Sequence, residues 1–347
     1  MPNRLQHIDV GAGIMILWMI IYHALPTSWS FLDSNPYAIS EYETINPCVL
    51  FPYLNFFMPW FFYKSGQFFE KREQKELLIK DARKLLLTFV LWSAIGYLFY
   101  LFFGALQHSL TIRSTTYSIV RGLFLTGKIP INEPLWFLVT LFGVRFLANL
   151  VLPNRDDKNG WWKIVTIVIG GYLLAYLYFC WDYRLLPYWV ANGTTGLVFF
   201  TLGYALRDYE DKWWLFIPCA LVYLVCSFVG FPMVDMMFNK LLAGNFLLWM
   251  PVSLCSIVAF NKVCRFIAQH LPTSFMAMVG KNAMVIYVTH ILIVSTIAFL
   301  LRYYKISEAY PYTLWIIICC YGIFLPILCK FIPEDIYKFV TRKQHER

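Results

Sequence analysis

The stretch IDVGAGIMILWMIIYHALP, residues 8–26, decides the fold class. It is apolar apart from Asp9 and His23, and it lacks the regular polar–apolar alternation of a β-barrel strand. A continuous apolar run of about 20 residues is long enough to cross the hydrocarbon core of a bilayer as a helix. The sequence therefore predicts a membrane-spanning helix at residues 8–26.

Nine further apolar runs follow along the chain. Of its 347 residues, 59% are hydrophobic and 14% are charged, and the mean hydropathy is +0.58. This composition excludes a soluble domain and predicts an all-α fold, a polytopic membrane helix bundle that forms one integral domain over residues 1–347. The ninth span is long, so we expect it to tilt or break. The predicted spans are residues 8–26, 46–69, 84–106, 134–152, 161–180, 186–206, 213–231, 243–261, 272–301 and 311–332.

The positive charges are distributed unevenly among the predicted loops. The net charge is +9. If the N-terminus is cytoplasmic, 19 of the 29 Lys and Arg residues lie in cytoplasmic segments and seven in outer segments. The positive-inside rule then places both termini in the cytoplasm. We expect a multi-pass protein of the cell (inner, or cytoplasmic) membrane that contacts membrane lipid. The basic charge is explained by topology, so we expect no nucleic acid partner.

The nine cysteines show no pattern of a metal site or a disulfide framework. Most of them lie inside apolar runs, and no CxxC or Cys/His spacing typical of a zinc site occurs. A cysteine in such a setting behaves as a small buried hydrophobe. We therefore expect no metal cofactor.

His23 is the first candidate catalytic residue. It lies fourteen residues after Asp9, about 21 Å along a helix, so the two side chains lie toward opposite faces of the bilayer. An ionisable side chain inside a membrane helix is costly and marks a functional site by default. Imidazole titrates near neutral pH, which suits a general base. The structural alternative is a histidine satisfied by a backbone carbonyl group or a water molecule.

Glu133 begins the fourth predicted span, on the same side as His23. We predict that its carboxylate orients His23 and stabilises its charged form. The alternative is an acid placed favourably at a helix N-terminus, where the helix dipole stabilises negative charge. Further side chains are predicted to line a substrate cavity, with His290 as a second imidazole candidate and Trp136 equally explained as an interfacial anchor. These predicted substrate-binding residues are Trp136, Asn282, Tyr287 and His290.

Basic residues gather between the second and third spans, in KREQKELLIKDARK, residues 71–84. They could anchor a polyphosphate ligand such as coenzyme A at the cytoplasmic face. The alternative is that they only set the topology and attract anionic lipid. Lys64 and Arg145 lie inside predicted spans, where a charge must reach the interface or find a partner. A structural ion pair would explain each of them.

Several segments together resemble the acyltransferase-3 membrane family, and within it the fucose-acetylase-like and surface-glycan O-acetyltransferases. The order and spacing of these segments carry the resemblance, which reaches from residue 8 to residue 290. The matching segments are IDVGAGIMILWMIIYH (8–23), FFMPWFFYKSGQFFEKR (56–72), ARKLLLTFVLW (82–92), PLWFLVTLF (134–142) and GKNAMVIYVTH (280–290).

The resemblance implies an enzyme that moves an acyl group, usually acetyl, from cytoplasmic acyl-CoA to a hydroxyl group of a cell-envelope carbohydrate or lipid-linked glycan. His23 matches the essential histidine of the family, and Gly13 matches the glycine of its first motif. Ser65 and Gly66 match the Ser-Gly element of the family, and Arg83 and Lys84 match its basic pair. Together with the basic residues Lys64 and Lys80, the expected acyl-CoA-binding residues are Lys64, Ser65, Lys80, Arg83 and Lys84.

Three positions depart from the family pattern. Ala12 stands where the family has an arginine, Thr88 replaces a proline, and Ala283 replaces a serine. The change at Ala12 leaves open a catalytically inactive relative. A non-enzymatic carrier or flippase for glycan or lipid would also explain charged and imidazole side chains inside the membrane. Inverted repeats would favour the carrier, and the sequence shows none that is strong.

Overall fold

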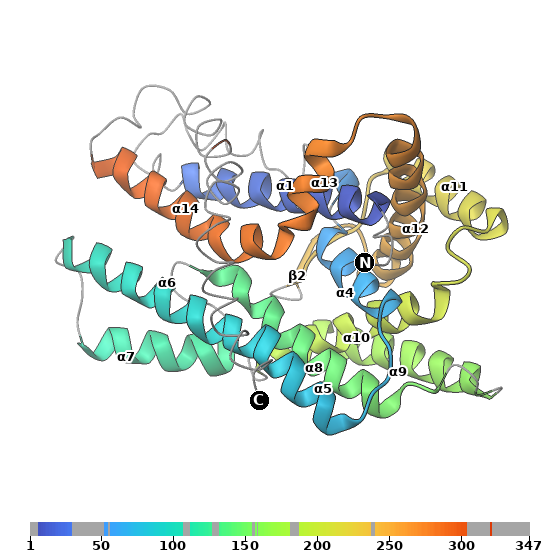
Figure 1. Ribbon diagram of the computed structural model, residues 1–347, viewed down its shortest axis with the longest axis horizontal. Coiled ribbons are helices and arrows are strands. Elements are labelled where there is room, and N and C mark those ends of the chain that lie inside the picture. Colours follow the sequence, from blue (N-terminus) through green and yellow to red (C-terminus); the bar gives the residue numbers. More distant parts are fainter. Residues whose placement is uncertain are drawn as a thin grey trace, which may run out of the picture. The chain divides into compact units, whose positions relative to one another are not determined.

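A computed structural model gives the structure of the chain (Figure 1). Its helices divide into two compact units, one made of residues 1–54 and 263–347 and the other of residues 55–262. Most of the described residues are helical. The structure describes residues 6–29, 52–54, 56–106, 112–126, 132–154, 157, 159–180, 187–236, 240–303 and 320.

The first unit is built on helix α1, Gln6–Trp29, which packs against α13, Ser274–Lys281, and α14, Ala283–Tyr303 (Figure 1). The unit also contains the short 3₁₀ turn η1, Pro52–Leu54. The side chain of Gln6 donates a hydrogen bond to the Thr273 hydroxyl at 3.0 Å. This bond joins the start of α1 to the residue that precedes α13.

Two glycines allow α1 and α13 to approach closely. A Cβ atom added to Gly13 would overlap with the carbonyl group of Met276, and one added to Gly280 would overlap with the carbonyl group of Asp9. Backbone therefore lies directly on backbone at this crossing, as small residues permit between membrane helices.

Helices α13 and α14 are separated by a break, the geometry of a broken span or of a re-entrant segment. They meet at Asn282, and their axes are bent by 80°. The Asn282 side chain donates a hydrogen bond to the carbonyl of Met278 at 2.7 Å, which satisfies one of the acceptors at the end of α13. The expectation that the ninth span tilts or breaks is confirmed.

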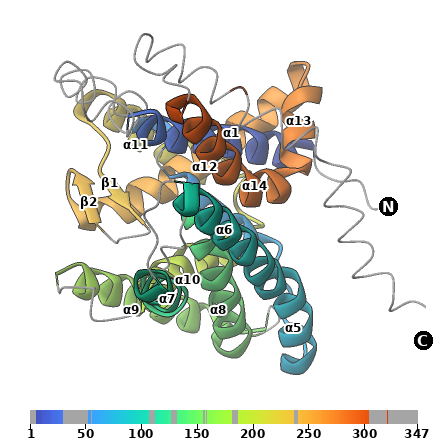
Figure 2. The same ribbon diagram turned by 90° about the vertical axis from the view of Figure 1, so that its left-hand side faces the viewer.

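The second unit contains the remaining helices (Figure 2). In it α5, the π-helical turn η2 and α6 follow one another without a gap, so that Gln74–Phe103 forms one candidate span. Its elements are α4 (Phe57–Gln67), α5 (Gln74–Asp81), η2 (Ala82–Leu86), α6 (Leu87–Leu106), α7 (Ile112–Arg121), the π-turn η3 (Gly122–Thr126), the 3₁₀ turn η4 (Glu133–Leu135), α8 (Trp136–Val151), α9 (Gly160–Cys180), α10 (Tyr188–Leu206), α11 (Trp213–Val229) and α12 (Phe246–His270), whose last turns belong to the first unit.

Helix α10 is the centre of the second unit and packs against α4, α8 and α9. Gly66 on α4 lies against the backbone of Phe200, where a Cβ atom would overlap with the carbonyl group. Aromatic rings fill the space around this crossing. Phe62 meets Phe137 edge to face with ring centroids 4.8 Å apart, and Phe69 meets Phe200 at 5.1 Å.

A short hairpin departs from the all-helical prediction. Strands β1, Met233–Asp235, and β2, Lys240–Ala243, pair antiparallel between α11 and α12. Gly230 and Gly244 flank the hairpin with φ angles of 107° and 74°. Only glycine adopts such angles without strain, so these two residues allow the chain to leave α11 and enter α12 sharply.

The apolar helices are long enough for a membrane protein, although they confirm only part of the predicted number. Within the described residues, four helices are long and apolar enough to cross a membrane: Gln74–Phe103, Glu133–Val151, Gly160–Cys180 and Phe246–His270. The bent α13–α14 pair adds a fifth, and α11 is shorter. The predicted tenth span, 311–332, lies almost wholly outside the described residues. The count of ten, the cytoplasmic termini and the single domain stay predictions.

Candidate functional site

The structure brings His23 and His290 together in the first unit. Nδ1 of His23 lies 3.3 Å from Nε2 of His290, and the ring centroids are 5.2 Å apart. His290 is completely buried in α14, whereas His23 on α1 is partly exposed. Two of the residues singled out in the sequence, 267 positions apart, therefore form one imidazole pair.

Both rings also contact backbone carbonyl groups of their own helices. Nδ1 of His23 lies 2.9 Å from the carbonyl oxygen of Met19. Nδ1 of His290 lies 2.7 Å from the carbonyl oxygen of Tyr287 and 3.2 Å from that of Ile286. These contacts fix the orientation of each ring relative to its helix.

The other predicted substrate-binding residues of the first unit are Asn282 and Tyr287, which precede His290 in the sequence. Tyr287 is buried one turn before His290, and its ring centroid is 6.3 Å from that of His290. Asn282 lies at the break between α13 and α14 and bonds to Met278. The proposed contact of these side chains with an acceptor stays a prediction.

Glu133 and Trp136 lie in the second unit. Glu133 is exposed and opens the 3₁₀ turn η4, with Pro134 after it, as the sequence predicted for the start of this span. Trp136 is buried at the start of α8, where its ring meets Phe137 edge to face at 6.2 Å. The predicted action of Glu133 on His23 joins residues of different units and stays a prediction.

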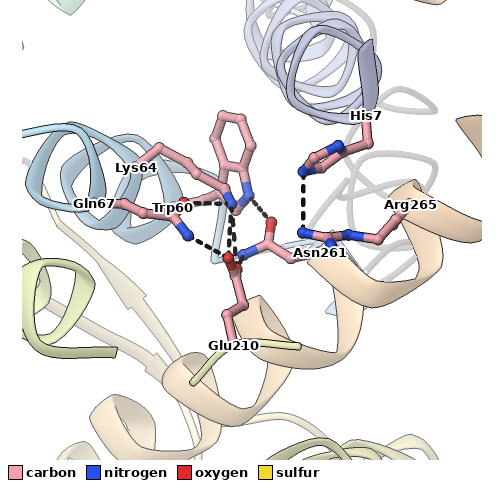
Figure 3. Close-up of polar contacts among 7 residues, drawn as sticks. All are labelled: His7, Trp60, Lys64, Gln67, Glu210, Asn261 and Arg265. Carbon is pink, nitrogen blue, oxygen red and sulfur yellow. Dashed lines mark hydrogen bonds and ion pairs between the residues drawn. The ribbon is translucent and has the colours of Figure 1, made fainter. Parts of the chain in front are cut away.

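Lys64 lies in a buried polar cluster of the second unit (Figure 3). Its ammonium group forms an ion pair with Glu210 at 3.2 Å and donates a hydrogen bond to Gln67 at 2.8 Å. Gln67 and Asn261 each donate a further bond to the Glu210 carboxylate. Asn261 in turn accepts a bond from the indole of Trp60 at 2.8 Å. The structural ion pair considered for Lys64 is confirmed, and its predicted contact with acyl-CoA stays a prediction.

Arg145 is held by a second ion pair in the same unit. Its guanidinium group donates to both carboxylate oxygens of Asp81, at 2.6 and 3.4 Å, and to the Ser65 hydroxyl at 3.3 Å. It also lies 5.4 Å from the ring centroid of Phe69. The bidentate geometry is the strongest form of an arginine–carboxylate contact. Ser65 therefore helps to connect α4 with α5 and α8.

The predicted donor-binding cations are exposed near this ion pair. Lys80 lies at the end of α5, and Arg83 and Lys84 lie in the π-helical turn η2. Such π-turns occur frequently at functional sites. Asp81 is neutralised by Arg145, so the surrounding basic residues keep a net positive charge at this end of the Gln74–Phe103 helix.

Sequence analysis missed the acidic partners Asp81 and Glu210. Each lies in a charged segment next to apolar helices, and both are almost fully buried. The available signal was indirect: Lys64 and Arg145 lie in predicted spans, where a charge must reach the interface or find a partner, and few acids border the spans. Their identities depend on which helices pack together, which a single sequence does not reveal.

Arg265 is another missed residue, and it lies in the first unit (Figure 3). Its guanidinium group is 3.4 Å from Nε2 of His7, near the start of α1. The contact places a positive charge about one and a half turns before Ala12, the position at which the family has an arginine.

Within the part of the chain that the structure describes, no group of three or more potential ligands is arranged to hold a metal ion. None of the described cysteines forms a disulfide bond: Cys180, Cys219, Cys226, Cys255, Cys264 and Cys320.

Comparison with known proteins identifies one family. The sequence model of the acyltransferase-3 family, described as an acyltransferase domain, matches residues 5–330. This match covers nearly the whole chain and includes parts of both compact units. Neither a curated protein nor a solved structure matches significantly.

Proposed function

The chain belongs to the acyltransferase-3 family of membrane proteins, and on this premise we propose that it is an O-acyltransferase of the cytoplasmic membrane. It moves an acyl group, acetyl in the first instance, from cytoplasmic acyl-CoA to a hydroxyl group of a cell-envelope carbohydrate or lipid-linked glycan. One observation carries the proposal: His23, at the position of the family's essential histidine, is a partly buried imidazole held by the backbone of an apolar helix.

In this mechanism His23 is the general base. Its imidazole removes the proton of the acceptor hydroxyl while the oxygen attacks the thioester carbonyl carbon. The tetrahedral intermediate then expels the coenzyme A thiolate as the carbon–sulfur bond breaks, and the imidazolium returns the proton to the sulfur. Base catalysis of this kind contributes roughly 10²–10⁴-fold to the rate. Positioning of the two substrates and stabilisation of the oxyanion supply the rest.

The basic residues of α5 and η2 would hold the phosphates of acyl-CoA. Lys80, Arg83 and Lys84 are exposed and close in sequence, which suits a flexible polyanionic ligand. Lys64 and Ser65 are engaged with Glu210 and Arg145. We therefore assign these two residues to the support of the donor site and the three exposed cations to direct contact with the phosphates.

A second candidate function rests on Ala12. The family arginine is absent there, which would suit a relative that binds glycan or lipid and transfers no acyl group. Acyl transfer by the purified wild-type protein, measured with labelled acyl-CoA and a glycan extract, decides between the two. If coenzyme A is released only at the background rate while glycan still binds, the enzymatic proposal is wrong.

Variants of His23 test the mechanism itself. His23→Ala should abolish transfer while the protein still inserts and elutes as a single species in detergent. His23→Gln should fail as well, because the amide forms hydrogen bonds but cannot take up a proton near pH 7. Glu133→Gln should give an intermediate loss if the carboxylate only orients the base. Normal turnover by His23→Ala would refute the assignment of the base.

A further inference from the structure

We propose that His290 is a positioning residue that, together with the Met19 carbonyl group, accepts the Nδ1–H of His23 and thereby makes Nε2 of His23 the basic atom. The inference rests on the proposed function, in which His23 is the base. It follows from the contacts of the two rings, because each nitrogen that faces a known acceptor must carry a proton. When both imidazoles are neutral, the contacts allow one arrangement of their N–H protons.

The environment of His290 is entirely protein. Its Nδ1 lies 2.7 Å from the carbonyl oxygen of Tyr287 and 3.2 Å from that of Ile286. Two lone pairs cannot face each other favourably at these distances, so Nδ1 carries the proton and donates it. A neutral imidazole has one N–H, which leaves Nε2 of His290 as an acceptor.

The tautomer of His23 follows from that of His290. Its Nδ1 lies 3.3 Å from that accepting Nε2 and 2.9 Å from the carbonyl oxygen of Met19. Both neighbours are acceptors, so Nδ1 of His23 carries the proton and is shared between them. Nε2 of His23 therefore keeps its lone pair, and this atom receives the proton of the acceptor hydroxyl.

This arrangement also assigns different tasks to the two imidazoles. The only lone pair of His290 is directed at His23, so His290 does not act as the base in this state. When His23 becomes an imidazolium, its Nδ1–H bond to His290 becomes charge-assisted and stronger. His290 thus stabilises the charged form of the base, a task usually performed by a carboxylate.

Variants at residue 290 separate positioning from packing. His290→Leu removes one of the two acceptors of the His23 Nδ1–H group, leaves the Met19 carbonyl, and should lower kcat on the order of 10–100-fold because the imidazolium loses its nitrogen acceptor, with the KM for both substrates nearly unchanged. His290→Gln keeps an oxygen near the place of Nε2 and should recover most of kcat. His270→Leu, at an exposed histidine of the same unit, is the matched control and should behave like wild type. A folded His290→Leu protein with wild-type kcat would overturn the inference.

A spectroscopic measurement tests the inference without activity and without a variant at residue 290. The ¹⁵N spectrum of histidine-labelled wild-type protein, with the His23 signals identified by their loss in His23→Ala, should show a protonated Nδ1 and an unprotonated Nε2. The opposite tautomer would overturn the inference even if His290→Leu failed to fold. If instead the wild-type protein transfers no acyl group, the proposed function fails, and if His23→Ala keeps its activity, the assignment of His23 as the base fails; the tautomer found in the spectrum stands in both cases.

Discussion

Gly13 and Gly280 face each other where α1 crosses α13, and neither position has room for a Cβ atom. A Cβ atom on Gly280 would lie 2.9 Å from the backbone nitrogen of Gly13. Both glycines belong to segments that resemble family motifs, and here they serve packing. They set how closely α1 approaches α13, and α13 leads through Asn282 into the helix that carries His290.

The first prediction concerns this helix crossing. Gly13→Ala should force α1 and α13 apart, lower the thermal stability of the detergent-solubilised protein and reduce acyl transfer through displacement of His23. Gly170→Ala on α9 is the control, because nothing lies within 4 Å of its added Cβ atom. Alanine favours a helix over glycine by up to about 1 kcal/mol, so the control should be neutral or stabilising. Equal melting temperatures for the two variants would contradict the close packing.

The buried ion pair of Lys64 and Glu210 gives the second prediction. Glu210→Ala leaves a buried ammonium group without its carboxylate, which should cost about 3–5 kcal/mol of stability. The double variant Lys64→Met/Glu210→Ala should lose less, because no uncompensated charge remains. Thermal unfolding in detergent measures both. The exposed pair of Asp157 and Lys163, 3.0 Å apart, is the control, and Asp157→Asn should leave the melting temperature nearly unchanged because solvent screens an exposed ion pair. A single variant as stable as the double variant would refute the argument.

The third prediction concerns the acyl donor. Replacing Arg83 and Lys84 with alanine should weaken acyl-CoA binding more than acceptor binding, and the difference should shrink at high salt because exposed charges are screened. Lys163→Ala with Lys212→Ala removes two exposed positive charges elsewhere and serves as the control. Binding is measured by calorimetry with a non-hydrolysable acyl-CoA analogue. Unchanged affinity in the first variant would leave these residues with a role in topology only.

The fourth prediction is the topology. Single cysteines placed at Ser34 and Lys75 in a background without exposed native thiols should react with a membrane-impermeant reagent from opposite sides of the membrane. The expectation follows from the bias of 19 to seven basic residues. Labelling of both positions from the same side would disprove the predicted arrangement of the first two spans.

The sequence was most informative where one residue carried the signal. His23 stood out because an imidazole inside an apolar run needs a reason, and its neighbour proved to be the second imidazole of the sequence analysis, His290. The break in the long ninth run could be anticipated, because a mostly apolar run of 30 residues exceeds what one span requires. These predictions needed only local pattern and the properties of the bilayer.

A single sequence does not reveal which side chains, far apart along the chain, form ion pairs in the fold. Glu210 lies 146 residues after Lys64, and nothing local says that α4 and α10 pack together. The same holds for Asp81 and Arg145, which are 64 residues apart. Glu133 was chosen as the partner of His23 because it was the acid on the expected side, and this pairing stays a prediction; the side-chain partner that the structure shows for His23 is the imidazole of His290.

The 80° bend at Asn282 also solves a problem of hydrophobic mismatch. As one straight helix, the 30-residue apolar stretch 272–301 would be about 45 Å long, half as long again as the hydrocarbon core. After the bend, the 21 residues of α14 measure about 31 Å, which matches that thickness. If α14 crosses the bilayer steeply, α13 runs close to the membrane plane. In that arrangement the bilayer has no need to thicken around this segment, and α13 packs against α1 from the side.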